Sequence, residues 1–276
     1  MTRRPLKERL VRDGLCATAR EAEAMVMAGL ALVNGAPCRP GQMAGDADAV
    51  TLKAKPPYAG KGGLKLEGAL RAFSLDVKDK VCIDAGASTG GFTDCLLKHG
   101  ASLVYAVDVG FGQLTGALRQ DRRVVNLERT NVSDMSLLSL SPRPVFASCD
   151  LSYLSLRDAM PAFRAILRGE GEAAALVKPL FEVEDSEARR TGVIPEAAYA
   201  PTLEGLVRAL NAQPGTRVLG VCPSPVRGSG GTVEFFLHVA FRPDGFAGAP
   251  PDLGTDISRS VHIALQGASL GKGDTP

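Results

Sequence analysis

Long apolar runs are absent from this chain of 276 residues. No stretch approaches the roughly eighteen consecutive apolar residues that indicate a membrane-spanning helix. The opening sequence MTRRPLKERL also lacks the apolar core of a secretory signal. These absences lead us to expect a cytosolic protein without a membrane partner. The length allows one full α/β domain together with a smaller module.

Paired cysteines and clustered histidines are also absent. The six cysteines form no Cys-x-x-Cys pair, so we expect buried reduced thiols rather than a zinc site or a disulfide framework. Of the three histidines, His99 is expected at a helix end, His238 in a strand and His262 in the C-terminal tail. This scatter gives no support to catalysis by histidine, and we expect no bound metal ion.

Charge is spread unevenly, although the net charge is only +2. Residues 1–65 contain eleven Lys and Arg against six Asp and Glu, a balance of +5, so the remainder has 21 against 24, a balance of −3. A basic N-terminal module on a mildly acidic body is what an enzyme needs if a separate piece binds a polyanion. A solvated surface with unevenly placed lysines would give the same balance, so charge alone leaves both interpretations open.

The chain is organised around residues 81–92, VCIDAGASTGGF. The pattern predicts a short buried strand at 81–83 that ends on Asp84, then a glycine-rich loop, then a helix at 92–99. Such a loop presents backbone N–H groups and the positive end of a helix to a ligand. A second strand at 103–107 ends at Asp108, whose carboxylate can accept hydrogen bonds from ribose hydroxyls. These features predict a nucleoside-cofactor pocket.

The glycine spacing narrows the choice of cofactor. A dinucleotide-binding G-x-G-x-x-G motif would need glycine at position 88, which is Ser88. The acidic residue that closes the strand, followed by Gly86 and Gly90, resembles the Asp-x-Gly-x-x-x-Gly loop of methyltransferases that use S-adenosylmethionine. The loop alone does not exclude a nicotinamide cofactor or an ordinary glycine-rich turn.

Residues 1–55 have the pattern of a small α/β module. Two short helices are expected, the second with a capping box at Thr18 and Glu21, and Asn34-Gly35 predicts a type I′ hairpin. The stretches LVRDGLCATAREAEA and AGLALVNG resemble the S4 RNA-binding domain, although Arg9 stands where an apolar residue is common. This resemblance implies a basic RNA-binding face, for which the candidates are Arg4, Arg9, Arg12, Arg20, Arg39 and, just beyond the module, Lys61.

Residues 56–63 are the predicted linker, stiffened by Pro56-Pro57, and residues 64–241 alternate strands with helices. This alternation is typical of a parallel sheet with helices on both faces. We predict a Rossmann-like α/β fold with a mostly parallel seven-stranded sheet and an antiparallel last strand at 232–241. Residues 242–276 are rich in Pro and Gly and are interpreted as a tail of uncertain order, with a short helix at 257–265. The other strands are expected at 81–83, 103–107, 124–127, 145–149, 173–177 and 218–221.

Charged residues lie at or near the ends of these strands, where ligands of such sheets bind. Asp150 ends the fourth strand and Lys178 the fifth, which would bring the two side chains within reach of one another. Glu234 is expected inside the last strand, where an unpaired carboxylate is costly to bury, so it needs a cation such as Lys65 or Lys178. Each residue alone could form a structural ion pair, but together they favour an active site.

These four residues resemble, in order and context, the Lys-Asp-Lys-Glu tetrad of the FtsJ-like ribose 2′-O-methyltransferases. The phrases DAGASTGGFTD, YAVDVGFGQL, LERTN, DLSYLSL and VKPLFEV are similar to the TlyA (haemolysin A) family, which joins an S4 domain to an FtsJ-like catalytic domain. The resemblance covers residues 4–241. It implies methylation of ribose 2′-hydroxyls of cytidines, with S-adenosylmethionine as cofactor and ribosomal RNA or a ribosomal subunit as partner.

The resemblance also implies individual roles. Lys178 would meet the 2′-oxygen as a base or as an orienting group, Asp150 would fix its ammonium beside the methyl donor, and Glu234 would hold Lys65 and the hydroxyl. Two other classes stay open, namely a non-catalytic RNA-binding or ribosome-assembly protein and a membrane-lysing haemolysin. The expected cofactor contacts are Asp84, Gly86, Ala87, Ser88, Gly90, Gly91, Phe92, Asp108, Val109 and Asn131.

Overall fold

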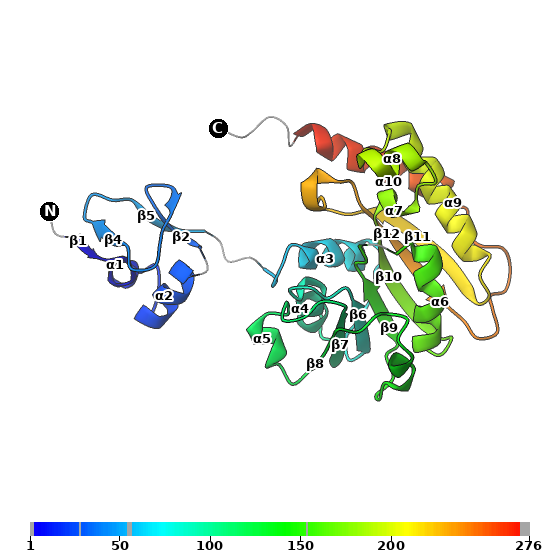
Figure 1. Ribbon diagram of the computed structural model, residues 1–276, viewed down its shortest axis with the longest axis horizontal. Coiled ribbons are helices and arrows are strands. Elements are labelled where there is room, and N and C mark those ends of the chain that lie inside the picture. The colour runs from blue at the N-terminus through cyan, green and yellow to red at the C-terminus, as the bar shows by residue number, and fades with distance from the viewer. Residues whose placement is uncertain (1–2, 28, 54–56, 153, 271–276) are drawn as a thin grey trace. The chain divides into compact units, whose positions relative to one another are not determined.

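The computed structural model describes residues 3–27, 29–53, 57–152 and 154–270 (Figure 1). The chain divides into two compact units, Met1–Pro57 and Tyr58–Pro276. The predicted boundary between residues 55 and 56 lies outside the described residues. From Tyr58 on, the predicted linker belongs to the second unit, because the Tyr58 side chain is buried and helix α3 begins at Gly62.

The first unit has two short helices and two small sheets. In these sheets β1 pairs with β4, and β2 lies between β3 and β5. Leu6 and Leu10 of α1 pack with Ala22 and Val26 of α2 and with Ala31 in a small apolar core. The elements are β1 Arg3–Pro5, α1 Leu6–Arg12, α2 Ala19–Met27, β2 Ala31–Val33, β3 Ala36–Pro37, β4 Met43–Gly45 and β5 Val50–Leu52.

Two local signals of the sequence are confirmed in this unit. The Thr18 hydroxyl accepts a hydrogen bond from Glu21 N at 3.1 Å, and the Glu21 carboxylate accepts one from Ala17 N at 2.8 Å. Together these bonds cap α2. Asn34 and Gly35 both have positive φ, 53° and 79°, as a type I′ turn requires, and this turn connects β2 to β3.

The second unit is built on a seven-stranded sheet in the order β11-β12-β10-β9-β6-β7-β8. As the sequence predicts, the last strand, β12, is antiparallel to its neighbours β10 and β11. The chain runs from β6 out to β8 and then crosses to β9 on the other side of β6. The carboxyl ends of β6 and β9 therefore form a switch point, where α/β sheets bind ligands. The strands are β6 Val81–Ala85, β7 Leu103–Asp108, β8 Val124–Glu128, β9 Phe146–Cys149, β10 Gly171–Val177, β11 Thr216–Pro223 and β12 Phe235–Phe241.

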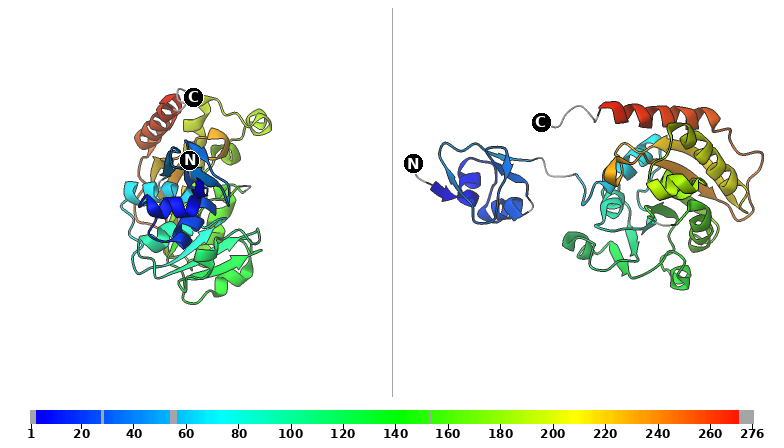
Figure 2. Two further views of the ribbon diagram at one scale, coloured as in Figure 1. Left: turned by 90° about the vertical axis from the view of Figure 1, so that its left-hand side faces the viewer. Right: turned by 45° about the horizontal axis from the view of Figure 1, so that its top comes forward.

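Helices cover both faces of this sheet (Figure 2). Strand alternation sends Ile83 of β6 to one face, where it belongs to a core with Phe163 of α6 and Leu203 of α9. Cys82 points to the other face, in a core with Leu66 of α3. The helices are α3 Gly62–Ala72, α4 Gly91–Lys98, α5 Gly116–Arg119, α6 Leu156–Ile166, α7 Pro179–Glu182, α8 Ser186–Thr191, α9 Tyr199–Asn211 and α10 Gly254–Leu270, with 3₁₀ turns η1 Met135–Ser139, η2 Glu196–Ala198 and η3 Ser229–Gly231.

The C-terminal segment contains more structure than the sequence predicts. In place of a short helix at 257–265, α10 spans Gly254–Leu270. Leu253, Ile257 and Val261 are buried in the core that also contains α6 and α9 residues. Helix α10 contacts β11 and α9, so it packs on the same face of the sheet as α9 (Figure 2). The segment after β12 is therefore part of the second unit.

Candidate active site

Two adjoining cavities open at the switch point of the sheet. The first, of about 510 Å³, is lined by residues at the ends of β6 and β7 and after β8. The second, of about 480 Å³, is lined by residues after β9 and β10 and before β12. Gly86, Ser88, Asp150 and Ser152 line both cavities, so the two spaces share a wall. Each volume falls in the range typical of small-ligand sites.

The loop after β6 lies tightly against the end of β9. Gly86 has φ +83°, and a Cβ there would clash with the carbonyl oxygen of Asp150. Both the backbone conformation and the close approach therefore require glycine. Gly86 N and Ala87 N donate to Val107 O at 2.8 and 3.1 Å, which fixes the loop to β7.

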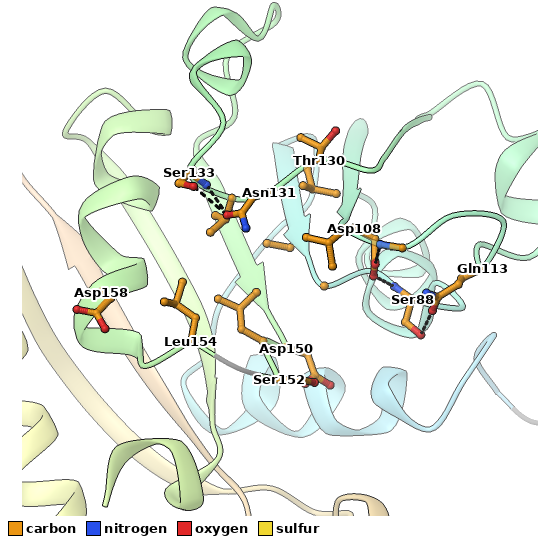
Figure 3. Close-up of a pocket in the computed structure, with 17 residues that line it drawn as sticks. Ser88, Asp108, Gln113, Thr130, Asn131, Ser133, Asp150, Ser152, Leu154 and Asp158 are labelled. Atoms are coloured by element: carbon orange, nitrogen blue, oxygen red, sulfur yellow. Dashed lines mark hydrogen bonds between the residues drawn. The ribbon is translucent and has the colours of Figure 1, made fainter. Parts of the chain in front are cut away.

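Asp108 lies with its carboxylate at the first cavity (Figure 3). Its Oδ2 accepts a hydrogen bond from Ser88 N and its Oδ1 accepts one from Gly110 N, both at 2.7 Å. Each carboxylate oxygen has a further lone pair, so ligand hydroxyls can donate to Asp108. The strand-end acid that the sequence singles out therefore lies where it can bind a ligand.

Val109 and Asn131, two other expected cofactor contacts, line the same cavity. Asn131 Oδ1 accepts hydrogen bonds from Ser133 N at 3.0 Å and Ser133 Oγ at 2.9 Å, which leaves Nδ2 as the group that Asn131 can offer. Ser88 Oγ donates to Gln113 Oε1 at 3.2 Å (Figure 3). Loop residues that follow strand ends carry most ligand contacts, and this position indicates further polar lining residues, namely Gln113, Thr130, Ser133 and Ser152. Asp158 also lines the cavity, but it lies in α6 and has no such signal.

Asp84, predicted to contact the cofactor, does not line either cavity. Its side chain is fully buried, and its two oxygens accept hydrogen bonds from Thr93 Oγ1 at 2.7 Å and Ser148 Oγ at 3.1 Å. Strand alternation is the reason, because Asp84 points to the same face as Cys82, beneath α4. Burial raises the pKa of Asp84 to about 7, against the lowering effect of the two hydroxyls. Asp84 therefore ties β6 to α4 and β9.

Four other predicted cofactor contacts also do not line either cavity, namely Ala87, Gly90, Gly91 and Phe92. Gly90 has φ +97°, and a Cβ there would clash with Leu118 of α5. A Cβ on Gly91 would lie 2.9 Å from Gly63 N, where α3 and α4 pack. These two glycines therefore allow helices to approach closely, and their contact with a cofactor stays a prediction.

Two lysine–carboxylate pairs line the second cavity. Lys178 Nζ lies 2.5 Å from Asp150 Oδ1 and donates to Ser152 Oγ at 2.9 Å. Lys65 Nζ lies 2.5 Å from Glu234 Oε2, and these two side chains are 9 % and 3 % exposed. All four charged side chains border the same cavity. The structure thus brings together the four residues that the sequence predicts to be catalytic.

Strand alternation explains why these residues meet. Lys178 follows Leu176 by two positions and Glu234 precedes Phe236 by two, and both of these apolar side chains belong to the core on the α3 side of the sheet. Helix α3 carries Lys65 to the same side. Glu234 was predicted inside the last strand, but β12 begins at Phe235. Its side chain therefore lies at the strand entrance, beside the cavity.

Glu234 occupies a confined space. Burial raises the pKa of Glu234 above its ordinary value, and the contact with Lys65 opposes that rise. The charges of Asp150 and Lys178 act on the same pKa in opposite directions, so the two ion pairs influence one another. A Cβ on Gly228 would clash with Glu234 Oε1, which means that glycine at position 228 makes room for the carboxylate.

The predicted RNA-binding residues differ in what their side chains contact. Arg9 is 7 % exposed, pairs with Asp13 at 2.7 Å and donates to the Gly45 carbonyl, so it is a structural residue and is not available to RNA. Arg12 pairs with Asp46 at 2.9 Å. The remaining candidates are exposed, three in the first unit and Lys61 in the second, namely Arg4, Arg20, Arg39 and Lys61.

Metal ligands are not clustered in the part of the chain that the structure describes. No group of three or more His, Cys, Asp or Glu side chains among these residues is placed to hold a metal ion. The six cysteines are free and buried, as their spacing predicts. None of the described helices combines the length and the apolar character needed to cross a bilayer.

Comparison with known proteins places the chain in a family. Residues 58–241 match the family model of the FtsJ-like methyltransferases. The chain is 38% identical over 242 residues to the 16S/23S rRNA (cytidine-2′-O)-methyltransferase TlyA of Mycobacterium tuberculosis, covering 85% of this chain and 89% of that protein. It is 32% identical over 235 residues to hemolysin A of Brachyspira hyodysenteriae, covering 84% of this chain and 98% of that protein.

A solved structure gives the same result. A protein from Streptococcus thermophilus described as a hemolysin is similar with a TM-score of 0.74 and 37% sequence identity, covering 99% of this chain and 100% of that chain. The similarity therefore extends over both units. The chain belongs to the FtsJ-like methyltransferase family, in the group that contains the TlyA and haemolysin A proteins.

Proposed function

We propose that this protein transfers a methyl group from S-adenosylmethionine to the ribose 2′-hydroxyl of a cytidine in ribosomal RNA. The observation that carries the proposal is the wall that the two cavities share, formed by Gly86, Ser88, Asp150 and Ser152. A donor in the first cavity and a ribose in the second would face one another across this wall. The name of the M. tuberculosis relative supports cytidine and ribosomal RNA as the acceptor.

The first cavity fits an adenosine-containing donor. The Asp108 carboxylate, held by two backbone N–H groups, keeps lone pairs for ribose hydroxyls. Val109 and Leu154 give the cavity apolar borders suited to an adenine ring, and Asn131 Nδ2 can donate to a ring nitrogen. When bound, S-adenosylmethionine supplies an electrophilic methyl group on a sulfonium. Asp150, on the shared wall, would stabilise that positive charge.

Lys178 is the residue that we assign to the 2′-oxygen. An ammonium group has three N–H donors, and contacts with Asp150 and Ser152 take two of them. The third is left to hold the 2′-oxygen in line with the methyl group. Alignment supplies about 7–11 kcal/mol of a barrier in favourable cases, whereas general base catalysis supplies about 3–5 kcal/mol. Orientation is therefore the larger contribution in this proposal.

Glu234 is the residue that we assign to accept the 2′-hydroxyl proton. Burial raises the pKa of Glu234, which makes its carboxylate a stronger base than an exposed glutamate. Lys65 Nζ holds this carboxylate in place at the cavity. Two lysines and two acids thus divide the work of fixing the nucleophile and removing its proton.

In this proposal the first unit is an S4-like domain that binds RNA. It contains the capped helix α2 and the type I′ hairpin that its local sequence predicts. Arg4, Arg20 and Arg39 are exposed, and arginine side chains of this kind bind phosphates. These contacts would add affinity without choosing the nucleotide, which the second cavity must do.

The test is transfer of tritium from methyl-labelled S-adenosylmethionine to ribosomal RNA, offered as small subunits, large subunits and naked RNA. We expect label in an alkali-resistant dinucleotide that begins with 2′-O-methylcytidine, because a blocked 2′-oxygen cannot attack the phosphodiester. A matched RNA with 2′-deoxycytidine at the mapped position should accept no label.

Other outcomes would point to the other classes. RNA binding without methyl transfer would indicate a non-catalytic RNA-binding or ribosome-assembly protein. Leakage of dye from phosphatidylcholine vesicles, caused by the pure protein, would indicate a membrane-lysing activity. Label found on a base instead of a ribose would show that the assignment of Lys178 to the 2′-oxygen is wrong.

A further inference from the structure

Glu182 is a buried acid that belongs to neither of the two lysine–carboxylate pairs. Its residue is 2 % exposed. Glu182 Oε1 accepts a hydrogen bond from Leu156 N and Oε2 accepts one from Ser155 Oγ, both at 2.7 Å. Burial raises the pKa of Glu182, against the lowering effect of these two bonds. A carboxylate is costly to bury, so these two hydrogen bonds are what keeps Glu182 in this place.

The two hydrogen bonds connect the segments that carry the Lys178–Asp150 pair. Lys178 directly precedes α7, and Glu182 is the last residue of that helix. Phe181 N donates to Lys178 O at 2.9 Å, so the turn between Lys178 and Glu182 is closed. On the other side, Ser155 caps α6 and ends the loop that starts at Asp150. Glu182 therefore links α7 to the start of α6.

The link is supported by two further bonds. Ser155 Oγ accepts from Arg157 N at 3.1 Å while it donates to Glu182, and Arg157 Nη1 donates to the Glu182 carbonyl at 3.3 Å. The partial positive charge at the start of α6 favours a carboxylate at this position. Because the bonds to Glu182 join α7 to α6, their loss would let Lys178 move relative to Asp150 and Ser152.

We propose that Glu182 is a positioning residue for methyl transfer, which fixes α7 against α6 and so sets Lys178 Nζ against Asp150 and Ser152. The rate effect rests on the proposed function, whereas the effect on Lys178 itself does not. Misplacement of a catalytic group by about 1 Å can cost about 10²-fold in rate. Glu182 has this effect without contact to either cavity, since it is absent from both linings.

Gln213 provides the matched control. Its Nε2 donates to Arg157 O at 2.7 Å, which ties the turn after α9 to the same helix α6 by a hydrogen bond that does not involve α7. Gln213→Ala therefore loosens α6 from a different neighbour. A general loss of stability in this region would affect Glu182→Ala and Gln213→Ala alike, whereas a positioning role affects only the first.

The experiment compares the full-length wild type with Glu182→Ala, Glu182→Gln and Gln213→Ala. Single-turnover methyl transfer and the dissociation constant for S-adenosylmethionine are measured for each. Lysine reactivity is measured by acetylation with N-hydroxysuccinimidyl acetate and mass spectrometry, with the exposed Lys78 as internal reference. Glutamine keeps an acceptor for Leu156 N, so Glu182→Gln is the milder variant if the alanine variant does not fold.

Glu182→Ala should lose about 10²-fold in the transfer rate, keep the affinity for S-adenosylmethionine, and make Lys178 react faster relative to Lys78. Glu182→Gln should lie between this variant and the wild type, and Gln213→Ala should match the wild type in all three. A wild-type rate in Glu182→Ala, or unchanged Lys178 reactivity, would overturn the proposal. If the wild type itself transfers no methyl group, the proposed function fails and the lysine reactivity alone decides this inference.

Discussion

Arg9 in the first unit and Lys178 in the second are both cations in contact with a carboxylate, but their surroundings differ. Arg9 pairs with Asp13 and donates to the Gly45 carbonyl, and its side chain is 8 % exposed. Lys178 pairs with Asp150 at the border of a cavity, and its side chain is 19 % exposed. Arg9 has its contacts inside the fold, whereas Lys178 has one side open to a cavity.

This difference indicates what each pair does. Loss of the Arg9 side chain removes a buried donor to the Gly45 carbonyl, at a cost of about 1–3 kcal/mol in stability. Beside an open cavity, water can solvate the remaining partner, so folding depends less on the pair and chemistry depends on it more. A buried ion pair alone is therefore weak support for an active site, and the cavity beside it is the stronger observation.

Lys178→Ala should give the largest effect, on the rate of methyl transfer. The rate should fall by about 10³-fold or more, because the variant lacks the group that we propose to align the 2′-oxygen. The affinity for S-adenosylmethionine should stay close to that of the wild type, since Asp108 and the first cavity are unchanged. Single-turnover rates and isothermal titration calorimetry measure the two quantities. Equal losses of both would make Lys178 a binding residue.

Arg9→Met should show the opposite behaviour. The free energy of unfolding of the first unit should fall by about 1–3 kcal/mol, because the Gly45 carbonyl loses a buried donor, while Asp13 keeps its contact with Arg12 Nε at 3.1 Å. Native-state hydrogen exchange of the full chain measures this unit through its own amides. At a temperature where both units are folded, the transfer rate at saturating RNA should equal that of the wild type. A rate loss like that of Lys178→Ala would contradict the purely structural role of Arg9.

Asp84→Asn tests a buried carboxylate of the second unit that lines neither cavity. The pKa of Asp84 in the folded protein is about 7, above the ordinary value of about 4. The folded state therefore holds an extra proton between these pH values, so this group's contribution to stability is full below about pH 4 and is lost as the pH rises to about 7. The variant has no charge to acquire, so its unfolding midpoint in urea should fall less across this range. Identical pH profiles for variant and wild type would contradict the buried, raised pKa.

Arg20→Ala should give the smallest effect, on RNA affinity. Loss of one phosphate contact should weaken binding a few-fold and reduce the slope of log affinity against log salt by about one. Arg12→Ala is the matched control, because Arg12 already pairs with Asp46 at 2.9 Å and should matter less to RNA. Fluorescence anisotropy at several salt concentrations measures both variants. A larger loss for Arg12→Ala would reverse the assignment within the first unit.

Most of the fold was predictable from periodicity and turn chemistry. Seven apolar strand patterns, most of them separated by helical ones, specify the sheet of the second unit. In the first unit, Asn34-Gly35 specifies the β2–β3 hairpin by backbone conformation alone. Helix α10 was predicted too short, because the Pro- and Gly-rich sequence before it hides its start. Ile257 and Val261 are buried against residues that are distant in sequence, including residues of α6 and α9. The local pattern around α10 does not contain these contacts.

The candidate site was predictable where it depends on strand ends and not where it depends on packing. Lys178 and Asp150 follow strands, so topology alone brings them to one edge of the sheet. Asp84 and Gly90 are predicted to contact the cofactor because of residue type and position at a strand end and in the loop after it, and Arg9 is predicted to bind RNA through the S4 resemblance. The contacts that they make in the structure depend on α4, on α5 and on the strands beside α1, which pack over them. No spacing rule within one segment contains that information.

Under the proposed function, the wall shared by the two cavities defines a template for bisubstrate inhibitors. A molecule that joins an adenosine-like group to a second nucleoside would engage Asp108 at one end and Lys178 at the other. It would lose its translational freedom once for both sites, which favours the joined molecule over its separate halves. Selectivity against other adenosine-binding enzymes would then come from the end that meets the lysines.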